Sequence, residues 1–93
     1  MKLMLVGDWK RTTLDRVGAK FMSGEDAGAP EGAELICRWH DIASRKAWMV
    51  VEADDASVIQ GWTGAWSEFI DWETYTVVDD DEISPVLEGL LGG

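Results

Sequence analysis

The chain has 93 residues, 46% of them apolar, and its 18 acidic and 8 basic residues give a formal net charge of -10. This charge argues against nucleic acids and anionic membranes as partners, because such partners attract stripes of lysine and arginine. The length fits one domain, which would bury only about 60% of its unfolded surface. Six tryptophans are many for so small a core, so part of the apolar surface is expected to meet a partner.

The chain start and the single cysteine predict a cytoplasmic protein without cofactor or metal. Met1–Val6 is apolar but too short for a signal peptide or a membrane span. The lone Cys37 lies in an apolar run and is interpreted as a reduced core thiol. One histidine and one cysteine cannot form a zinc set, and the acidic run Asp79–Glu82 lacks the spacing of a calcium loop.

The first half of the chain predicts a strand, a helix and a second strand. Lys2–Asp8 is a continuous apolar run, typical of a central strand. Thr12 is a candidate N-cap for a helix that runs to Gly24, and a mobile surface loop is expected over Ser23–Gly32. Ala33–Ile42 reads as a strand whose alternation puts Leu35, Cys37 and Trp39 on one face and Ile36, Arg38, His40 and Ile42 on the other.

The second half predicts strand, helix and strand, followed by a tail. Ala47–Ala53 reads as another central strand, and Asp54 or Asp55 caps a helix whose apolar stripe reaches Phe69. Ile70–Val78 alternates like an edge strand, and Asp79–Glu82 is interpreted as its solvated end. Ser84 and Pro85 resemble the start of a short helix with an apolar face made by Val86, Leu87, Leu90 and Leu91.

This order of elements, βαββαβ, predicts an α+β fold of the ferredoxin-like kind. The sheet would have four antiparallel strands in the order four, one, three, two, with two helices on one face. The two strands placed in the middle are the two runs without central charges. Residues 1–82 are assigned to this domain, and residues 83–93 to a tail that docks on its own domain or on a partner.

Both faces of the predicted sheet centre are apolar, which favours a homodimer. Met4 and Val6 alternate with Leu3 and Leu5 along the first strand. Two helices cover only one face of such a sheet. The other face is therefore expected to meet a second copy of the chain.

Three segments carry a resemblance to a known family. Leu35–His40, Trp48–Asp55 and Trp66–Trp72 resemble the family DUF3303, whose architecture is similar to that of the dimeric α/β-barrel proteins. That group includes cofactor-free monooxygenases, muconolactone isomerases and stress-responsive small proteins. The resemblance implies the fold and a dimeric α/β barrel, but no activity and no catalytic residues, and Ser84–Gly93 lies outside the segments that carry it.

A pocket between the two sheets of the dimer is the predicted functional site. If Arg38 and His40 point away from the helices, Trp48 and Glu52 join them from the next strand and Tyr75 from the edge strand. This arrangement needs an odd number of residues in the hairpin loop around Ala43–Lys46.

His40 is the candidate acid or base, because it is the only side chain with an ordinary pKa near neutrality, and Glu52 or Glu73 could orient it. Arg38, Trp48, Glu52 and Tyr75 are candidate ligand-binding residues, with Arg38 suited to a carboxylate or carbonyl. The structural alternatives are a strand-end histidine bonded to backbone and an Arg38–Glu52 ion pair.

Two functional hypotheses follow. In the first, the inter-sheet pocket binds a small hydrophobic or carbonyl-bearing metabolite and, at most, catalyses a monooxygenase-like or isomerase-like reaction on it. In the second, the sheet face is only a dimer seal, and the protein is a structural or interaction module. The sequence does not decide whether the protein is an enzyme.

Overall fold

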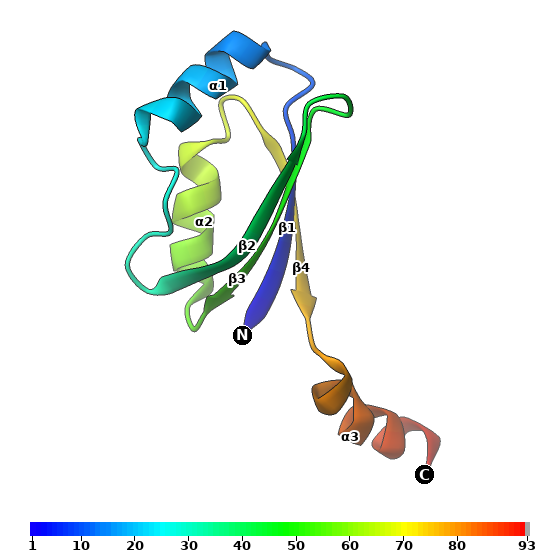
Figure 1. Ribbon diagram of the computed structural model, residues 1–93. Helices are drawn as coiled ribbons and strands as arrows, with labels where there is room; N and C mark the ends of the chain where they lie inside the picture. The colour runs from blue at the N-terminus through cyan, green and yellow to red at the C-terminus, as the bar shows by residue number, and fades with distance from the viewer. Residues whose placement is uncertain (93) are drawn as a thin grey trace.

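The computed structural model describes residues 1–92 and contains four strands and three helices in that part of the chain (Figure 1). In chain order these are β1 (Lys2–Asp8), α1 (Leu14–Ser23), β2 (Ala33–Asp41), β3 (Lys46–Ala53), α2 (Ala56–Ala65), β4 (Asp71–Val77) and α3 (Asp80–Leu91). The predicted α+β class is confirmed.

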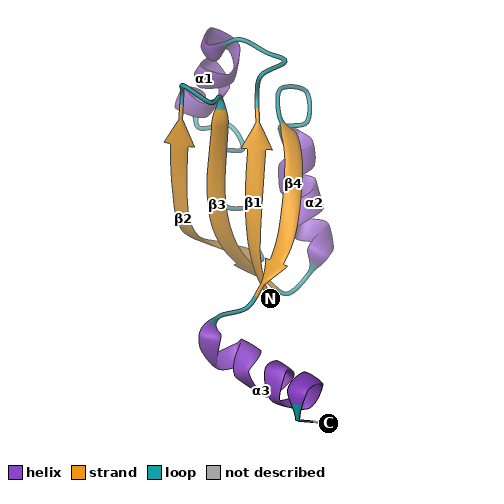
Figure 2. Cartoon of the chain, turned by 90° about the vertical axis from the view of Figure 1, so that its right-hand side faces the viewer, coloured by secondary structure: helices purple, strands orange, loops and turns teal. Residues whose placement is uncertain are grey.

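The strands form one antiparallel sheet in the order β2-β3-β1-β4 (Figure 2). This is the predicted order, with β1 and β3 in the middle. Both central strands alternate strictly between buried and half-buried residues over most of their length. Their lack of central charges therefore reflects burial of one face and partial shielding of the other.

Helices α1 and α2 lie on the same side of the sheet (Figure 1). The buried core sits between the sheet and these helices, and it consists of Leu3, Leu5, Trp9, Val17, Met49, Val51, Ala53, Ile59, Trp62, Trp66 and Ile70. Gly7 allows close packing between β1 and its neighbours, because a Cβ there would lie 2.9 Å from side-chain atoms of both Ile70 and Trp72. Only glycine fits under that tryptophan without a shift.

The caps of the first two helices follow the predicted signals, with small displacements. Thr13 rather than Thr12 occupies the N-cap of α1, and Gly24 ends the helix with a φ of 80°. Asp55 caps α2 by accepting a hydrogen bond from the Ser57 backbone N–H. Helix α2 ends at Ala65, four residues before the predicted end, and the following residues form turns that lead into β4.

The acidic run at the end of β4 has a different role from the one predicted. Asp79 caps α3, and its side chain and that of Glu82 form a reciprocal capping box. Helix α3 therefore starts at Asp80, not after Ser84, and Pro85 lies inside it. Carboxylates are favoured here because they lie at the positive end of the helix dipole.

The tail helix does not pack on its own domain. Helix α3 contains no buried residue and extends beyond the end of the sheet (Figures 1 and 2). Its Val86, Leu87, Leu90 and Leu91 are all exposed. In this conformation the tail does not dock on the sheet of its own chain. Its docking on a partner stays a prediction.

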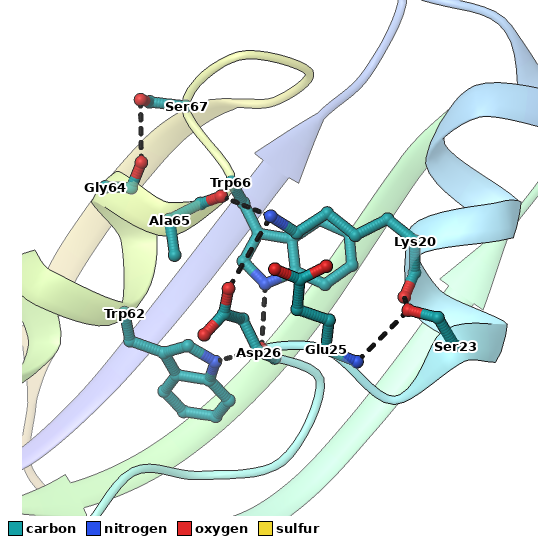
Figure 3. Close-up of polar contacts among 9 residues, drawn as sticks. All are labelled: Lys20, Ser23, Glu25, Asp26, Trp62, Gly64, Ala65, Trp66 and Ser67. Carbon is teal, nitrogen blue, oxygen red and sulfur yellow. Dashed lines mark hydrogen bonds and ion pairs between the residues drawn. The ribbon is translucent and has the colours of Figure 1, made fainter.

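The loop between α1 and β2 is fastened to α2 by two tryptophans (Figure 3). The indole N–H groups of Trp62 and Trp66 both donate to the Asp26 carbonyl oxygen at 2.8 Å. Lys20 of α1 donates to the Ala65 carbonyl at 2.7 Å, and its ammonium lies 3.6 Å from the Asp26 carboxylate. These contacts connect α1, the loop and α2 on one side of the sheet.

Within residues 1–92, no helix has the length and apolar character that crossing a bilayer requires. The compartment predicted from the sequence stays a prediction.

Candidate binding pocket beneath the first helix

A β-bulge in β2 determines which side chains can form a site. Leu35 pairs with Val51 and Cys37 pairs with the adjacent Val50, so Ile36 is an extra residue in β2. One extra residue reverses the alternation of everything after it. Leu35 therefore faces the helices, whereas Cys37 and Trp39 face the other side, and the prediction that all three share one face is wrong.

The hairpin that follows has an even number of residues. Asp41 pairs with Lys46, which leaves the four-residue turn Ile42–Arg45. The predicted pocket required an odd number. Arg38 is paired with Met49 and His40 with Ala47, so both side chains lie on the helix side, together with buried Met49.

The five predicted site residues are consequently divided between the two faces of the sheet. Trp48 pairs with Val6, Glu52 with Lys2 and Tyr75 with Met4, all on the side without helices. Glu52 accepts a hydrogen bond from the Met1 N-terminus at 2.8 Å, so the proposed Arg38–Glu52 ion pair is absent. Neither Glu52 nor Glu73 can orient His40, because both carboxylates lie across the sheet from it. The roles assigned to these five residues stay predictions.

A cavity of about 340 Å³ lies on the helix side, between α1, α2 and the sheet end that carries the β2–β3 turn. We call it the α1 pocket. Its walls are predominantly apolar and are supplied by Trp9, Leu14, Val17, Gly18, Phe21, Met22, Ile42, Ala47, Met49, Trp62, Trp66, Ile70 and Trp72, with Arg38, His40, Asp41 and Lys46 adding polar groups. The buried indole N–H of Trp72 has no hydrogen-bond partner among the described residues.

Arg38 and His40 share the ring of Phe21 as a packing surface. The guanidinium carbon of Arg38 lies 4.8 Å from the Phe21 ring centroid, and the His40 ring meets Phe21 edge-on at a centroid distance of 5.2 Å. Burial, followed by the positive charge of Arg38, lowers the pKa of His40 below its ordinary value. Burial also lowers the pKa of Arg38. At neutral pH the Arg38 guanidinium therefore lies beside a neutral imidazole.

A family model described as "Domain of unknown function (DUF3303)" matches residues 1–91. The chain belongs to the DUF3303 family. The match includes β1 to α3, so it extends through most of the tail that the three resembling segments did not reach. No curated protein and no solved structure matches the chain.

The other face of the DUF3303 sheet carries a second apolar surface, which we call the open face. Its middle is formed by Met4, Val6, Trp48 and Val50, and it extends over Cys37, Trp39 and Tyr75. Trp39 is 60% exposed and Tyr75 48% exposed. Tyr75 donates a hydrogen bond to Glu73, which raises the pKa of Tyr75. No helix covers this face within the described residues (Figure 2).

Sequence reasoning missed most of the residues that form the α1 pocket of this DUF3303 chain. Trp9 and Phe21 are not among the predicted site residues. Both line the pocket. The gap is evident only in the structure, where α1 buries only Val17 although it carries Leu14, Phe21 and Met22 as well. A short helix with more apolar side chains than it buries indicates a gap beneath it.

Proposed function

We propose that this protein binds a small, largely apolar molecule in the α1 pocket. The observation that carries the proposal is the 340 Å³ cavity with predominantly apolar and aromatic walls. Close-packed interiors contain few voids larger than a water molecule, and a cavity of about 150 Å³ already holds benzene. A cavity about twice that size has room for a bicyclic ring system. The pocket thus replaces the inter-sheet space as the site for the predicted hydrophobic or carbonyl-bearing metabolite.

Binding, rather than turnover, is the activity that we propose. A general base is usually oriented by a second group. The neighbours of His40 are the Phe21 ring and the Arg38 charge, and neither is an acceptor that would fix a tautomer. His40 is therefore assigned a contact role at the pocket.

The test is a titration of the full-length chain with 2-naphthamide, followed by tryptophan fluorescence. Four tryptophans line the pocket, so occupancy changes the emission. Ligands of this size gain about 0.3–0.5 kcal/mol per heavy atom, which predicts a Kd between about 10 µM and 1 mM. The fluorescence should saturate with one molecule bound per chain.

A matched pair of variants locates the binding. Gly18 lines the pocket and a Cβ there would meet no atom within 4 Å, so Gly18→Leu is expected to occupy the cavity and weaken binding at least about tenfold. Gly61→Leu makes the same change at an exposed position of α2 that does not line the pocket, and it should leave binding unchanged. Absence of saturable binding, or equal binding by both variants, would refute the proposal.

A second proposal concerns the open face, which we infer to be the contact between two copies of the chain. The exposed Trp39 and Tyr75 favour it, since large apolar patches on small proteins mark interaction sites. Four strands spaced about 4.8 Å apart and about 23 Å long give roughly 400 Å² of planar face. Stable interfaces need about 800 Å² per partner.

Helix α3 supplies part of the missing area. Its 12 residues span about 18 Å, and its exposed apolar residues add a contact surface about 10 Å wide. The proposed homodimer therefore includes α3, packed on the partner chain. In this arrangement the open face acts as a dimer seal, consistent with the interaction-module alternative. A cytoplasmic location belongs to the same proposal.

Sedimentation equilibrium of chains 1–93 and 1–79 tests the dimer. The full chain should be dimeric at micromolar concentration, and the chain without α3 should associate at least about tenfold more weakly. A full chain that stays monomeric at several hundred micromolar would refute the second proposal and leave the first intact.

A further inference from the structure

Arg38 is a half-buried cation without an acidic partner. One Nη1 hydrogen bond goes to the Ala27 carbonyl at 2.6 Å, and no carboxylate among the described residues lies within salt-bridge distance of the guanidinium. This is unexpected in a chain with 18 acids and 8 bases. A charge that loses solvent without gaining a counter-ion costs free energy.

The acidic side chains closest in the sequence to these contacts are already engaged. Asp26, beside the Ala27 that Arg38 contacts, lies 3.6 Å from the Lys20 ammonium. Asp41, on the strand of Arg38, accepts from the Ala43 backbone N–H and the Ser44 hydroxyl in the hairpin turn. The protein thus supplies neither carboxylate to Arg38, whose remaining N–H donors stay available.

Arg38, which lacks a carboxylate partner among the described residues, is part of the pocket wall. The guanidinium stacks on Phe21, which lines the cavity, and Arg38 and His40 line it too. A guanidinium is planar, and its fork of N–H donors matches the two oxygens of a carboxylate. His40, neutral at pH 7, can add a donor or an acceptor beside it.

From these contacts we propose that the ligand of the α1 pocket is an organic carboxylate, with its apolar body in the cavity and its carboxylate on Arg38. This inference rests on the proposed function and adds the chemical class of the ligand. The net charge of -10 repels anions at long range. A preference for an anion over a neutral analogue of the same shape must therefore come from local contacts.

The experiment compares 2-naphthoate with 2-naphthamide, which share the ring system and differ in the charge of the head group. Charge-assisted hydrogen bonds are stronger than neutral ones, so the wild-type chain should bind 2-naphthoate about tenfold more tightly or better. Arg38→Gln should abolish this preference, measured as the ratio of the dissociation constants of the two probes. Arg38→Lys, which keeps the charge without the fork, should retain part of the preference.

Arg16→Gln is the matched control, because Arg16 is an exposed arginine on α1 that stacks on Phe69 and does not line the pocket. It removes the same charge and should leave the preference unchanged. Thermal unfolding of each variant checks that it is folded. If both probes bind equally well, or if Arg16→Gln and Arg38→Gln change the preference equally, the carboxylate proposal fails and the binding function stands. If neither probe binds, both fail.

Discussion

The two faces of the sheet are similarly apolar in sequence but differ in what covers them. On the helix side, Leu5 and Val51 are fully buried under α1 and α2. On the open side, Met4 and Val50 occupy equivalent positions on the same strands and are only half-buried. The helix side gains a packed core with one cavity, whereas the open side keeps a continuous apolar surface. A strand that is apolar at both sets of alternating positions therefore indicates two apolar faces, but it does not indicate which face forms a site.

The largest expected difference between the faces is in core stability. Leu5→Ala should lower the free energy of unfolding by about 3 kcal/mol, because Leu5 is 0% exposed and its removal leaves a cavity. Met4→Ala, on the opposite face of the same strand, should cost about 1 kcal/mol or less in the monomer. Urea unfolding at low protein concentration measures both. Equal losses would show that the two faces are packed alike.

The next effect concerns association through the open face. Trp39→Ala should weaken the homodimer by about 2 kcal/mol, or roughly thirtyfold in Kd, because tryptophans are enriched among the residues that dominate interface energies. Thr76→Ala changes an exposed residue of β4 on the helix side and serves as the control. Sedimentation equilibrium gives both constants. A Trp39→Ala chain that dimerises like the wild type would place the contact elsewhere.

Two glycines on the helix side should respond to alanine in opposite directions. Gly7→Ala should destabilise the fold by about 1–3 kcal/mol, since the new Cβ would lie 2.9 Å from Ile70 and Trp72 atoms. Gly18→Ala should stabilise it by about 0.5–1 kcal/mol, because a helical residue gains propensity where nothing obstructs it. Denaturant midpoints report both. Destabilisation by Gly18→Ala would contradict the open space beneath α1.

The smallest expected effect is the pH dependence that His40 contributes. Its pKa in the folded chain is lowered, so the folded state binds this proton less readily than the unfolded state. This contribution is fully present above pH 6.5 and is lost as the pH falls through the folded pKa. Asp8, Asp15 and Asp55 also have lowered pKa values. The stability that these carboxyl groups contribute is lost only when the pH falls below their ordinary pKa of 3.8.

Urea midpoints at pH 7.5 and 5.5 isolate the histidine. The wild type should lose more stability than His40→Gln over this interval. An identical loss in both chains would show that His40 titrates as it does in the unfolded chain.

The topology could be predicted because it rests on features that a sequence displays directly. The charge-free centres of the predicted strands Lys2–Asp8 and Ala47–Ala53 identified the central strands, and Asp55 and Gly24 marked helix ends through local capping chemistry. These signals depend on nearest neighbours and on burial. They do not depend on how strands are aligned.

The site could not be predicted because it depends on alignment. Nothing in Leu35, Ile36 and Cys37 distinguishes a regular apolar run from one that contains a bulge, since all three residue types suit a strand. Without an Asn-Gly pair, the turn Ile42–Arg45 also gave no register, and Arg45 adopts a φ of 56° without being glycine. Arg38 and His40 were therefore placed on the wrong side.

The extra residue at Ile36 has a consequence for how this family can vary. A point substitution alters one side chain on one face, whereas loss of a single residue before Arg38 would move that arginine, Trp39 and His40 across the sheet together. The cation would then leave the cavity and the exposed indole would enter it. A length change of one residue in β2 would thus exchange the cation and the indole between the two faces of the sheet.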